Sequence, residues 1–522
     1  MKSHNVVLFI SLMLVSLLAV GCGGGGGGGG DAVLTNPTGT TGTGTNSTPT
    51  TSNSVPTGYQ SAGFPALSNS ITVSPASGKS SLVLVNHGST DVNVEVAAAA
   101  SGFAANIKAV AVAGKPLRGF VATVPNPDQQ LHGMLRRLEK TMPRFSAVTS
   151  ANRVSAQQAA IRADFLGQQV SFDVLSGMGT GTKQAVTATC RKITAISGSD
   201  IKINFYLDTS VSYNSSVEQL IEDLSTAWAL IYPTVRATFG TEPPASFNSL
   251  GNDITVLISP VVDSAGFFYS GDLYAPSQVV GGVSNQRKMF YLQYNPTDLS
   301  TESLASTMAH EFQHMINFYQ RRVNNLEEED WLNESMSGYA EHVCGYKVST
   351  NNQSKGLQMN QFFADIESMP LVIDPWPGEH ANYGQVYLFG TWLGQQYGTN
   401  GSLVNLLTSK NVGIAAVAGV TGETFETTFA KWMVALQVND TTGNVYGYKD
   451  IDLRKTYSYA GNLADVTLTG PQTRTNSNIF PYATGLFTVK KFSSAFVEMS
   501  GANGATLNIT LPTGVSSFEL HQ

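Results

Sequence analysis

The alternation of hydrophobic and polar positions marks strands towards both ends of the chain. Short apolar runs alternate with polar residues between 66 and 125, and again after 450, and residues such as Gly and Asn separate the runs. A hydrophobic period of two that is interrupted by turn residues is typical of β-strands. We therefore predict a β-sandwich-like domain at 66–125 and a C-terminal β domain at 446–522.

The centre of the chain shows a helical period instead. Apolar residues recur three and four positions apart in stretches that begin near Ser216, Ser300 and Trp331, and this spacing puts them on one face of an α-helix. Apolar runs of strand length are found at 186–193, 201–207, 254–258 and 289–293. The pattern predicts an α+β domain at 184–445, in which 289–293 is either an edge strand or a buried one.

Another helical pattern precedes this central domain. Leu131, Leu135 and Leu138 fall in register from Asp128 onward, and Pro143 is expected to break the helix. The segment 126–183 is predicted to be either an interdomain element or a propeptide-like one, and the sequence supports both.

The first 22 residues predict a secretion signal. An apolar run, 6–20, is too short and wrongly flanked for a membrane-spanning helix. Residues 18–22, with Cys22 last, resemble the lipobox of bacterial lipoproteins, in which the cysteine carries the lipid. The alternative is an ordinary secretory cleavage site that contains a cysteine. The resemblance implies a chain that is held at a membrane through Cys22, in the bacterial cell envelope.

Residues 23–65 predict a flexible tether. Eight glycines follow Cys22, and Thr, Gly, Asn, Ser and Pro dominate the rest. Such a composition buries no core and spans about 35 to 40 Å as a random coil. Gly23 beside the cysteine resembles the pattern of outer-membrane lipoproteins, so we expect an outer-membrane or secreted protein.

The length and the charge of the chain limit the number of domains and the class of partner. A chain of 522 residues exceeds one hydrophobic core and predicts two or three domains. Thirty basic residues against 37 acidic ones, a net charge of −7 and the lack of any basic run argue against nucleic acid as a partner. Cys190 and Cys344 remain open between a disulfide and two separate buried thiols.

Candidate chemistry is concentrated in the run His310-Glu311-Phe312-Gln313-His314. Residues four apart share one face of a helix, so His310 and His314 can direct both imidazoles at one Zn²⁺. Glu311 is then placed beside the metal, where a carboxylate can act as general base toward a water molecule. The apolar residues of the same stretch form the opposite, buried face.

A second helical segment, 331–341, supplies Glu334, and the two segments together resemble the gluzincins, zinc peptidases whose third ligand is a Glu on a following helix. With the downstream run 383–393, the chain also resembles the hyicolysin family of bacterial metallopeptidases. The resemblance covers about 185–440. It implies a thermolysin-like catalytic domain flanked by the two β domains.

Carried over residue by residue, the resemblance implies three zinc ligands, His310, His314 and Glu334, and Glu311 as general base. One departure is Gly338, because thermolysin has an aspartate there that orients the first histidine. Glu341 is a candidate to replace it, with a solvated helix carboxylate as the alternative.

Stabilising the oxyanion of the transition state needs a hydrogen-bond donor that faces it. Tyr383 is our first candidate for this donor, and His380 is the competing one. The GxMEN segment, by which aminopeptidases of this group bind a free amino terminus, has no counterpart here. We therefore expect a zinc endopeptidase acting on extracytoplasmic proteins or peptides. The alternative is a surface binding or adhesion lipoprotein whose zinc site is structural or inactive.

Overall fold

The computed structural model describes most of the chain from residue 72 onward. The described residues are 72–73, 79–98, 104–111, 127–144, 164–176, 182–245, 247, 250–297, 300–350, 352–459, 463–475, 485–500 and 506–521. The expected signal peptide, Cys22 and the tether lie outside this part of the chain. Among the helices that these residues form, none combines the length and the apolar character needed to cross a membrane.

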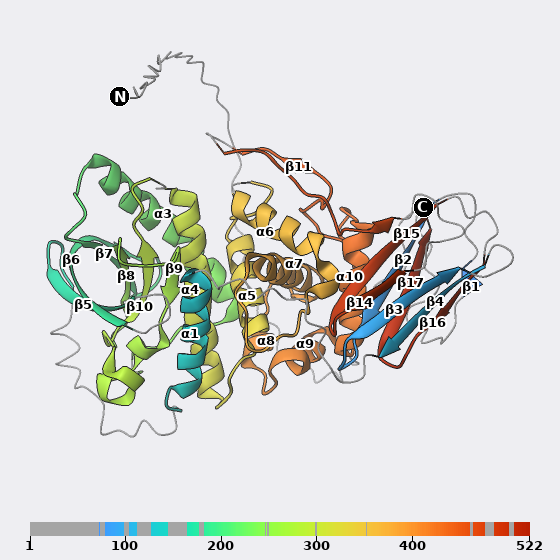
Figure 1. Ribbon diagram of the computed structural model, residues 1–522. Helices are drawn as coiled ribbons and strands as arrows, with labels where there is room; N and C mark the ends of the chain where they lie inside the picture. The colour runs from blue at the N-terminus through green and yellow to red at the C-terminus, as the bar shows by residue number, and fades with distance from the viewer. Residues whose placement is uncertain are drawn as a thin grey trace, which may run out of the picture. The chain divides into compact units, whose positions relative to one another are not determined.

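A six-stranded sheet forms one half of the central region (Figure 1). Its strands, in spatial order, are β5 (Gln169–Ser176), β6 (Thr182–Ala195), β7 (Lys202–Asp208), β8 (Ile254–Ser259), β10 (Lys288–Gln293) and β9 (Gly266–Phe268). The inner strands β7, β8 and β10 run parallel, and β9 is antiparallel to β10. Every residue of β8 is buried, which explains its continuous apolar run.

This strand order resolves one open alternative and extends the expected domain. β10, at Lys288–Gln293, is paired on both sides, so it is the buried strand and not the edge. The edge is instead the short strand β9, which was not predicted because its three residues carry no periodic pattern. The sheet also begins at Gln169, with β5 paired to β6, before the expected start at 184.

Helices form the other half of the central region, so the architecture is mixed α/β. They are α3 (Ser215–Phe239), α4 (Thr301–Val323), α5 (Asp330–Val343), α6 (Gln353–Ala364), α7 (His380–Tyr397), α8 (Val404–Thr408), α9 (Gly413–Thr421) and α10 (Phe425–Val438). Short 3-10 turns occur at Ser270–Leu273, Pro276–Gln278, Val280–Gly282 and Ile366–Ser368. The earlier helix α1 covers Pro127–Thr141.

The predicted apolar face of α4 is buried against α3 and the sheet. Phe312 lies edge-on to Trp228, with ring centroids 4.9 Å apart, and stacks on Tyr232 at 5.5 Å. The Ser300 hydroxyl caps the helix by accepting a hydrogen bond from the Ser303 amide. This packing fixes the rotation of α4, so that the opposite face turns toward α5.

Close packing also holds α7 against α5. A side chain at Gly390 would collide with the carbonyl of Ser335, and one at Gly394 would collide with the ring of Tyr339. The missing side chains let the two backbones approach, which brings the first turn of α7 to the level of the ligand helices.

The two β regions are joined in common sheets. One sheet has the order β1 (Thr72–Val73), β16 (Thr506–Thr510), β4 (Ala104–Ala111), β3 (Val92–Ala98) and β14 (Gly485–Val489). The other has the order β13 (Arg474–Thr475), β15 (Ser493–Ser500), β2 (Lys79–Asn86) and β17 (Val515–His521). A small hairpin pairs β11 (Thr456–Tyr457) with β12 (Val466–Thr467).

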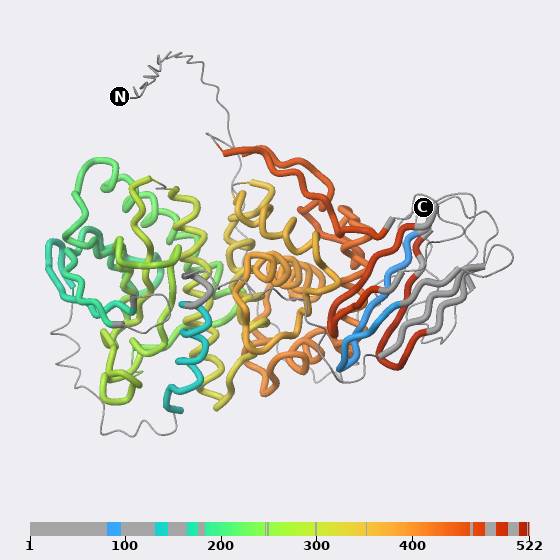
Figure 2. Tube along the Cα trace, viewed as in Figure 1, coloured from blue at the N-terminus to red at the C-terminus, as the bar shows by residue number. Residues whose placement is uncertain are grey.

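Blue strands from the beginning of the chain therefore lie beside red strands from its end (Figure 2). The expectation of one separate β domain at each end is corrected: strands of both regions pair with each other. Strand patterns in a sequence give the strands but not their partners, because pairing depends on residues hundreds of positions apart.

Candidate active site

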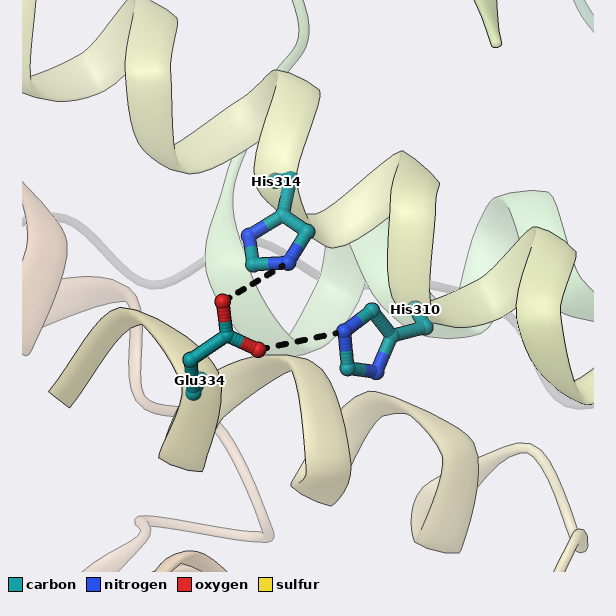
Figure 3. A group of neighbouring side chains, drawn as sticks. All are labelled: His310, His314 and Glu334. Carbon is teal, nitrogen blue, oxygen red and sulfur yellow. Dashed lines mark ion pairs between the residues drawn. The ribbon is translucent and has the colours of Figure 1, made fainter. Parts of the chain in front are cut away.

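Three candidate metal ligands converge between α4 and α5 (Figure 3). His310 and His314 extend from neighbouring turns of α4, and Glu334 faces them from α5. His310 Nε2 is 3.4 Å from Glu334 Oε2, and His314 Nε2 is 3.7 Å from Glu334 Oε1. His314 and Glu334 are fully buried, and His310 is 8% exposed. The arrangement gives two nitrogen donors and one carboxylate around one point.

The residues fit Zn²⁺. Both carboxylate oxygens of Glu334 are buried without a hydrogen-bond partner, which is costly for an anion unless a cation occupies the space that they face. Two imidazoles and one carboxylate are the donor set of catalytic zinc sites, in which three protein ligands leave one position open. The site is therefore a zinc site.

Hydrogen bonds at the far nitrogen of each imidazole orient the rings. His310 Nδ1 is 2.8 Å from Glu341 Oε1, and His314 Nδ1 is 3.0 Å from Asn333 Oδ1. An acceptor at Nδ1 keeps the proton there and leaves Nε2 free for the metal. Glu341 is thus the orienting carboxylate and not a solvated one, whereas Asn333 was missed although it directly precedes Glu334.

The position of Gly338 explains why the orienting carboxylate lies elsewhere on α5. A Cβ atom at Gly338 would stand 3.2 Å from the Cα of Tyr387, so even the first atom of a side chain would be crowded by α7. Glu341 reaches His310 from the next turn and is held in turn by Lys355, whose Nζ is 2.8 Å from Glu341 Oε1. Lys355 was not predicted, because only the tertiary packing of α6 brings it here.

We expect Glu341→Gln to weaken zinc binding by about 10–100-fold, the range for outer-sphere partners of metal ligands. The amide keeps the shape of the side chain but removes the negative charge that strengthens the His310 imidazole as a donor. Competition with a chromogenic chelator measures the affinity. Glu302→Gln, at an exposed position of α4, is the control and should bind zinc like the parent. Equal affinity of Glu341→Gln and the parent would contradict the assignment.

The charges around the ligands are strongly coupled. Burial alone would lower the pKa of His310, but the facing carboxylates of Glu334 and Glu341 raise it to about 10. Burial lowers the pKa of His314 well below its ordinary value, and the nearby Arg136 guanidinium acts in the same direction. Burial alone would raise the pKa of Glu334, but the two histidines hold it well below its usual range. At pH 7 the metal-free site therefore carries its proton on His310.

Zinc binding at pH 7 is accordingly expected to release about one proton, because zinc requires the neutral imidazole of His310. The proton competes with the metal, so affinity falls as pH falls and rises about tenfold per unit between pH 7 and the His310 pKa. Calorimetric titration in two buffers of different ionisation enthalpy counts the released protons. A binding enthalpy that is independent of the buffer would refute this expectation.

Glu311 stands beside the ligands and is fixed from the edge strand. Its Oε2 accepts a hydrogen bond of 2.7 Å from the backbone amide of Phe268 in β9, and the residue is 2% exposed. Burial raises the pKa of the Glu311 carboxyl to about 7. The carboxyl is thus held in one orientation and poised to exchange a proton near neutral pH.

A cavity of about 400 Å³ opens onto this site. β9, α4, α5, α6 and the first turn of α7 contribute to its lining, together with one side chain of α1, His132. Tyr383 and His380 both line the cavity, but they differ in environment: the Tyr383 hydroxyl is buried without a partner, whereas His380 is exposed. His132 was not predicted, since no motif marks a lone histidine 178 residues before the HEFQH run.

Comparison with known proteins adds a sequence relative. No family model matches the chain. The neutral metalloprotease ShpI of Staphylococcus hyicus is 24% identical over 188 residues, which cover 32% of this chain and 40% of the relative. Together with the buried His310, His314 and Glu334, this similarity supports a gluzincin-type zinc peptidase. The chain thus matches less than half the length of ShpI.

Solved structures of M1 zinc metallopeptidases are also similar in part. One from Deinococcus radiodurans has 14% sequence identity and a TM-score of 0.26, and covers 53% of this chain and 59% of that one. A two-domain M1 zinc metallopeptidase bound to L-arginine has 11% identity and a TM-score of 0.27, with 53% and 59% covered.

Cys190 and Cys344 are both buried and both free, so the open alternative resolves to two separate thiols. Burial raises the pKa of Cys190 to about 11 and that of Cys344 to about 12. Neither thiol is grouped with the zinc ligands in the described part of the chain.

Proposed function

We propose that the protein is a zinc metalloendopeptidase in which Glu311 is the general base. The observation that carries the proposal is the buried Glu311 carboxyl, which is held by the Phe268 amide next to a complete His310–His314–Glu334 ligand set. A structural zinc site needs ligands but has no use for an oriented carboxylate beside them. This arrangement favours a hydrolase over a binding protein.

A Zn²⁺ ion held by His310, His314 and Glu334 would lower the pKa of a bound water and would polarise the scissile carbonyl. The Phe268 amide occupies Oε2 of Glu311 and leaves Oε1 to accept the proton of the attacking water. Glu311 then donates that proton to the nitrogen of the leaving amine, so that the carboxylate is restored at the end of the cycle.

Tyr383 is proposed to donate a hydrogen bond to the oxyanion. Its hydroxyl lies buried at the cavity wall without a partner, so it is available to a ligand. Burial and the nearby Glu334 carboxylate raise the pKa of Tyr383 well above its ordinary value, which keeps the hydroxyl protonated. His380, by contrast, lies exposed at the start of α7, where water satisfies it.

Tyr383→Phe is expected to lower kcat by about 10²–10³-fold with little change in zinc content, since it removes one donor to the oxyanion. The matched control is Tyr397→Phe at the other end of α7, away from the cavity lining. Steady-state kinetics on a quenched peptide measure both variants. If His380→Ala shows the larger loss instead, the donor is His380.

The cavity favours an endopeptidase over an aminopeptidase. Among the described residues that line it, the carboxylates are Glu311 and Glu341. Glu341 is already engaged by His310, Lys355 and the Ser306 hydroxyl. Glu311 is held by the Phe268 amide and is assigned to the attacking water in the proposed reaction, so neither carboxylate is left for a free α-amine. The edge strand β9 lies beside the cavity, where an extended peptide can add its backbone to the sheet.

The proposed substrates are extracytoplasmic proteins or peptides. This rests on the expected signal sequence, the lipid on Cys22 and the tether at 23–65, which would hold the catalytic region at a distance from the membrane of the bacterial cell envelope.

The test uses end-blocked quenched peptides and the same peptides with a free amino terminus, incubated with the zinc-loaded chain that starts after Gly30. An endopeptidase cuts the blocked peptides at internal bonds. Cleavage that needs a free amino terminus would favour an aminopeptidase. Zinc-loaded protein that cuts neither set after limited proteolysis to remove latency would favour the binding-protein alternative.

A further inference from the structure

Helix α1, Pro127–Thr141, is built into the wall of the active site. Leu131 and Leu135 are each 1% exposed, and they belong to the same hydrophobic core as the sheet and the ligand helices. The Tyr274 hydroxyl donates a hydrogen bond of 3.0 Å to the carbonyl of Pro143, just after the helix. In Figure 1, α1 lies beside α4.

Charged contacts fix the position of α1 against the zinc ligands. Arg136 is 2% exposed, and its Nε lies 3.9 Å from Glu334 Oε1, while its Nη1 donates to Glu139 Oε2 at 3.0 Å. Arg322 of α4 donates to the carbonyl of Glu139. Because Nε is too far from Glu334 for a hydrogen bond, Arg136 does not occupy the oxygens that zinc needs.

This anchoring places His132, one turn before Arg136, at the cavity. His132 lines the cavity together with His310, Glu311 and Tyr383. Its ring stands edge-on to that of Tyr383, with centroids 6.2 Å apart and planes at 73°. His132 Nδ1, like the Tyr383 hydroxyl, is buried and has no hydrogen-bond partner. His132 Nδ1 and the Tyr383 hydroxyl, two unpartnered polar atoms from different helices, therefore belong to residues that line the same cavity as His310.

The imidazole of His132 is in a form that can donate a hydrogen bond. Burial lowers the pKa of His132 to about 4, so the ring is neutral at pH 7 and carries one N–H. A buried N–H or lone pair without a partner costs free energy unless a ligand supplies the missing bond.

We propose that His132 is a substrate-binding residue that, together with Tyr383, donates a hydrogen bond to the oxygen of the peptide group held at the open position of the zinc site. The proposal rests on the proposed peptidase function and adds α1 to the active site. It assigns α1 a permanent role rather than that of a removable propeptide.

The test compares His132→Ala and His132→Gln with the control Arg137→Ala, which changes the exposed neighbour on the same helix. Zinc affinity is measured on the metal-free full chain. On the zinc-loaded full chain we measure kcat/KM for an end-blocked peptide and the calorimetric Kd for an end-blocked phosphinic peptide, whose tetrahedral phosphorus with its two oxygens imitates the transition state. We expect His132→Ala to weaken phosphinic-peptide binding and kcat/KM by about 10–100-fold, the range for a hydrogen bond to a charged group.

Further results separate this role from a structural one. Zinc affinity should stay within about twofold, and His132→Gln, whose amide also donates, should recover part of the loss. The effects of His132→Ala and Tyr383→Phe should be less than additive, since both act on one oxygen. If His132→Ala does not fold, His132→Gln and His132→Asn supply the same comparison.

Three results would overturn the proposal. Unchanged phosphinic-peptide binding would remove His132 from the site, a gain in activity would make α1 an inhibitory plug, and a tenfold loss of zinc affinity would make His132 a metal ligand instead. If the parent chain binds the phosphinic peptide but cuts no peptide, the proposed function fails. The calorimetric Kd of the phosphinic peptide for the His132 variants then still decides the role of His132.

Discussion

Replacing Glu311 by Gln is expected to lower kcat/KM by about 10²–10⁴-fold while the protein keeps its zinc. The amide preserves the size of the side chain and can still accept the hydrogen bond from the Phe268 amide, but it cannot take up a proton. The substitution leaves the three zinc ligands unchanged, so the zinc content measured by atomic absorption should equal that of the parent. Hydrolysis of an end-blocked peptide gives the rate.

The matched control is Glu302→Gln, an acidic residue at the exposed start of the same helix. It has the same chemical change without access to the cavity, so its rate should equal that of the parent. A Glu311→Gln variant with zinc bound and full activity would remove Glu311 from the mechanism. Loss of zinc together with activity would instead assign Glu311 a role in holding the metal.

Replacing Glu334 by Gln is expected to abolish zinc binding at micromolar zinc and, with it, peptide hydrolysis. The change removes the one anionic ligand and leaves the Arg136 guanidinium beside two imidazoles without the Glu334 carboxylate. The loss of affinity should exceed the 10–100-fold that outer-sphere changes produce. Isothermal calorimetry measures the affinity directly.

Thermal unfolding gives an independent measurement of the same effect. Zinc at 1,000 times its Kd should stabilise the parent by about 4 kcal/mol, because it binds the folded state alone. The midpoint of the parent should therefore rise on adding zinc and fall on adding a chelator, whereas that of Glu334→Gln should respond to neither. Glu218→Gln, exposed on α3, should behave like the parent. A zinc-dependent shift in Glu334→Gln equal to that of the parent would show that the metal binds elsewhere.

The sequence alone was sufficient for the local parts of the site. The spacing of His310 and His314 places both on one helical face, and the apolar residues of α4, such as Phe312, specify which face is buried. Glu334 follows on a helix with its own apolar stripe, and the structure brings the three side chains together. Helical periodicity is a short-range property, so it can be recognised without knowledge of the fold.

Other parts of the site depend on contacts between elements far apart in the chain. Glu341 was open between an orienting carboxylate and a solvated one, and its contact with His310 Nδ1 across α4 and α5 decides for the first. Glu311 is held by β9, an edge strand that was not predicted because three residues are too few to show a period. The joining of the two β regions was likewise missed, since strand pairing is decided across the whole chain.

The contrast between local and distant contacts is clearest in α1. Its amphipathic pattern predicts a helix from the sequence, and the helix forms at Pro127–Thr141. No local pattern indicates that Arg136 meets Glu334 or that His132 reaches the cavity. The sequence by itself determined α1, the two ligand helices and the zinc-binding residue types, because these follow from spacing along one backbone. Only the tertiary structure decided which distant side chains line the cavity, because burial and charge pairing act between segments that are far apart in the sequence.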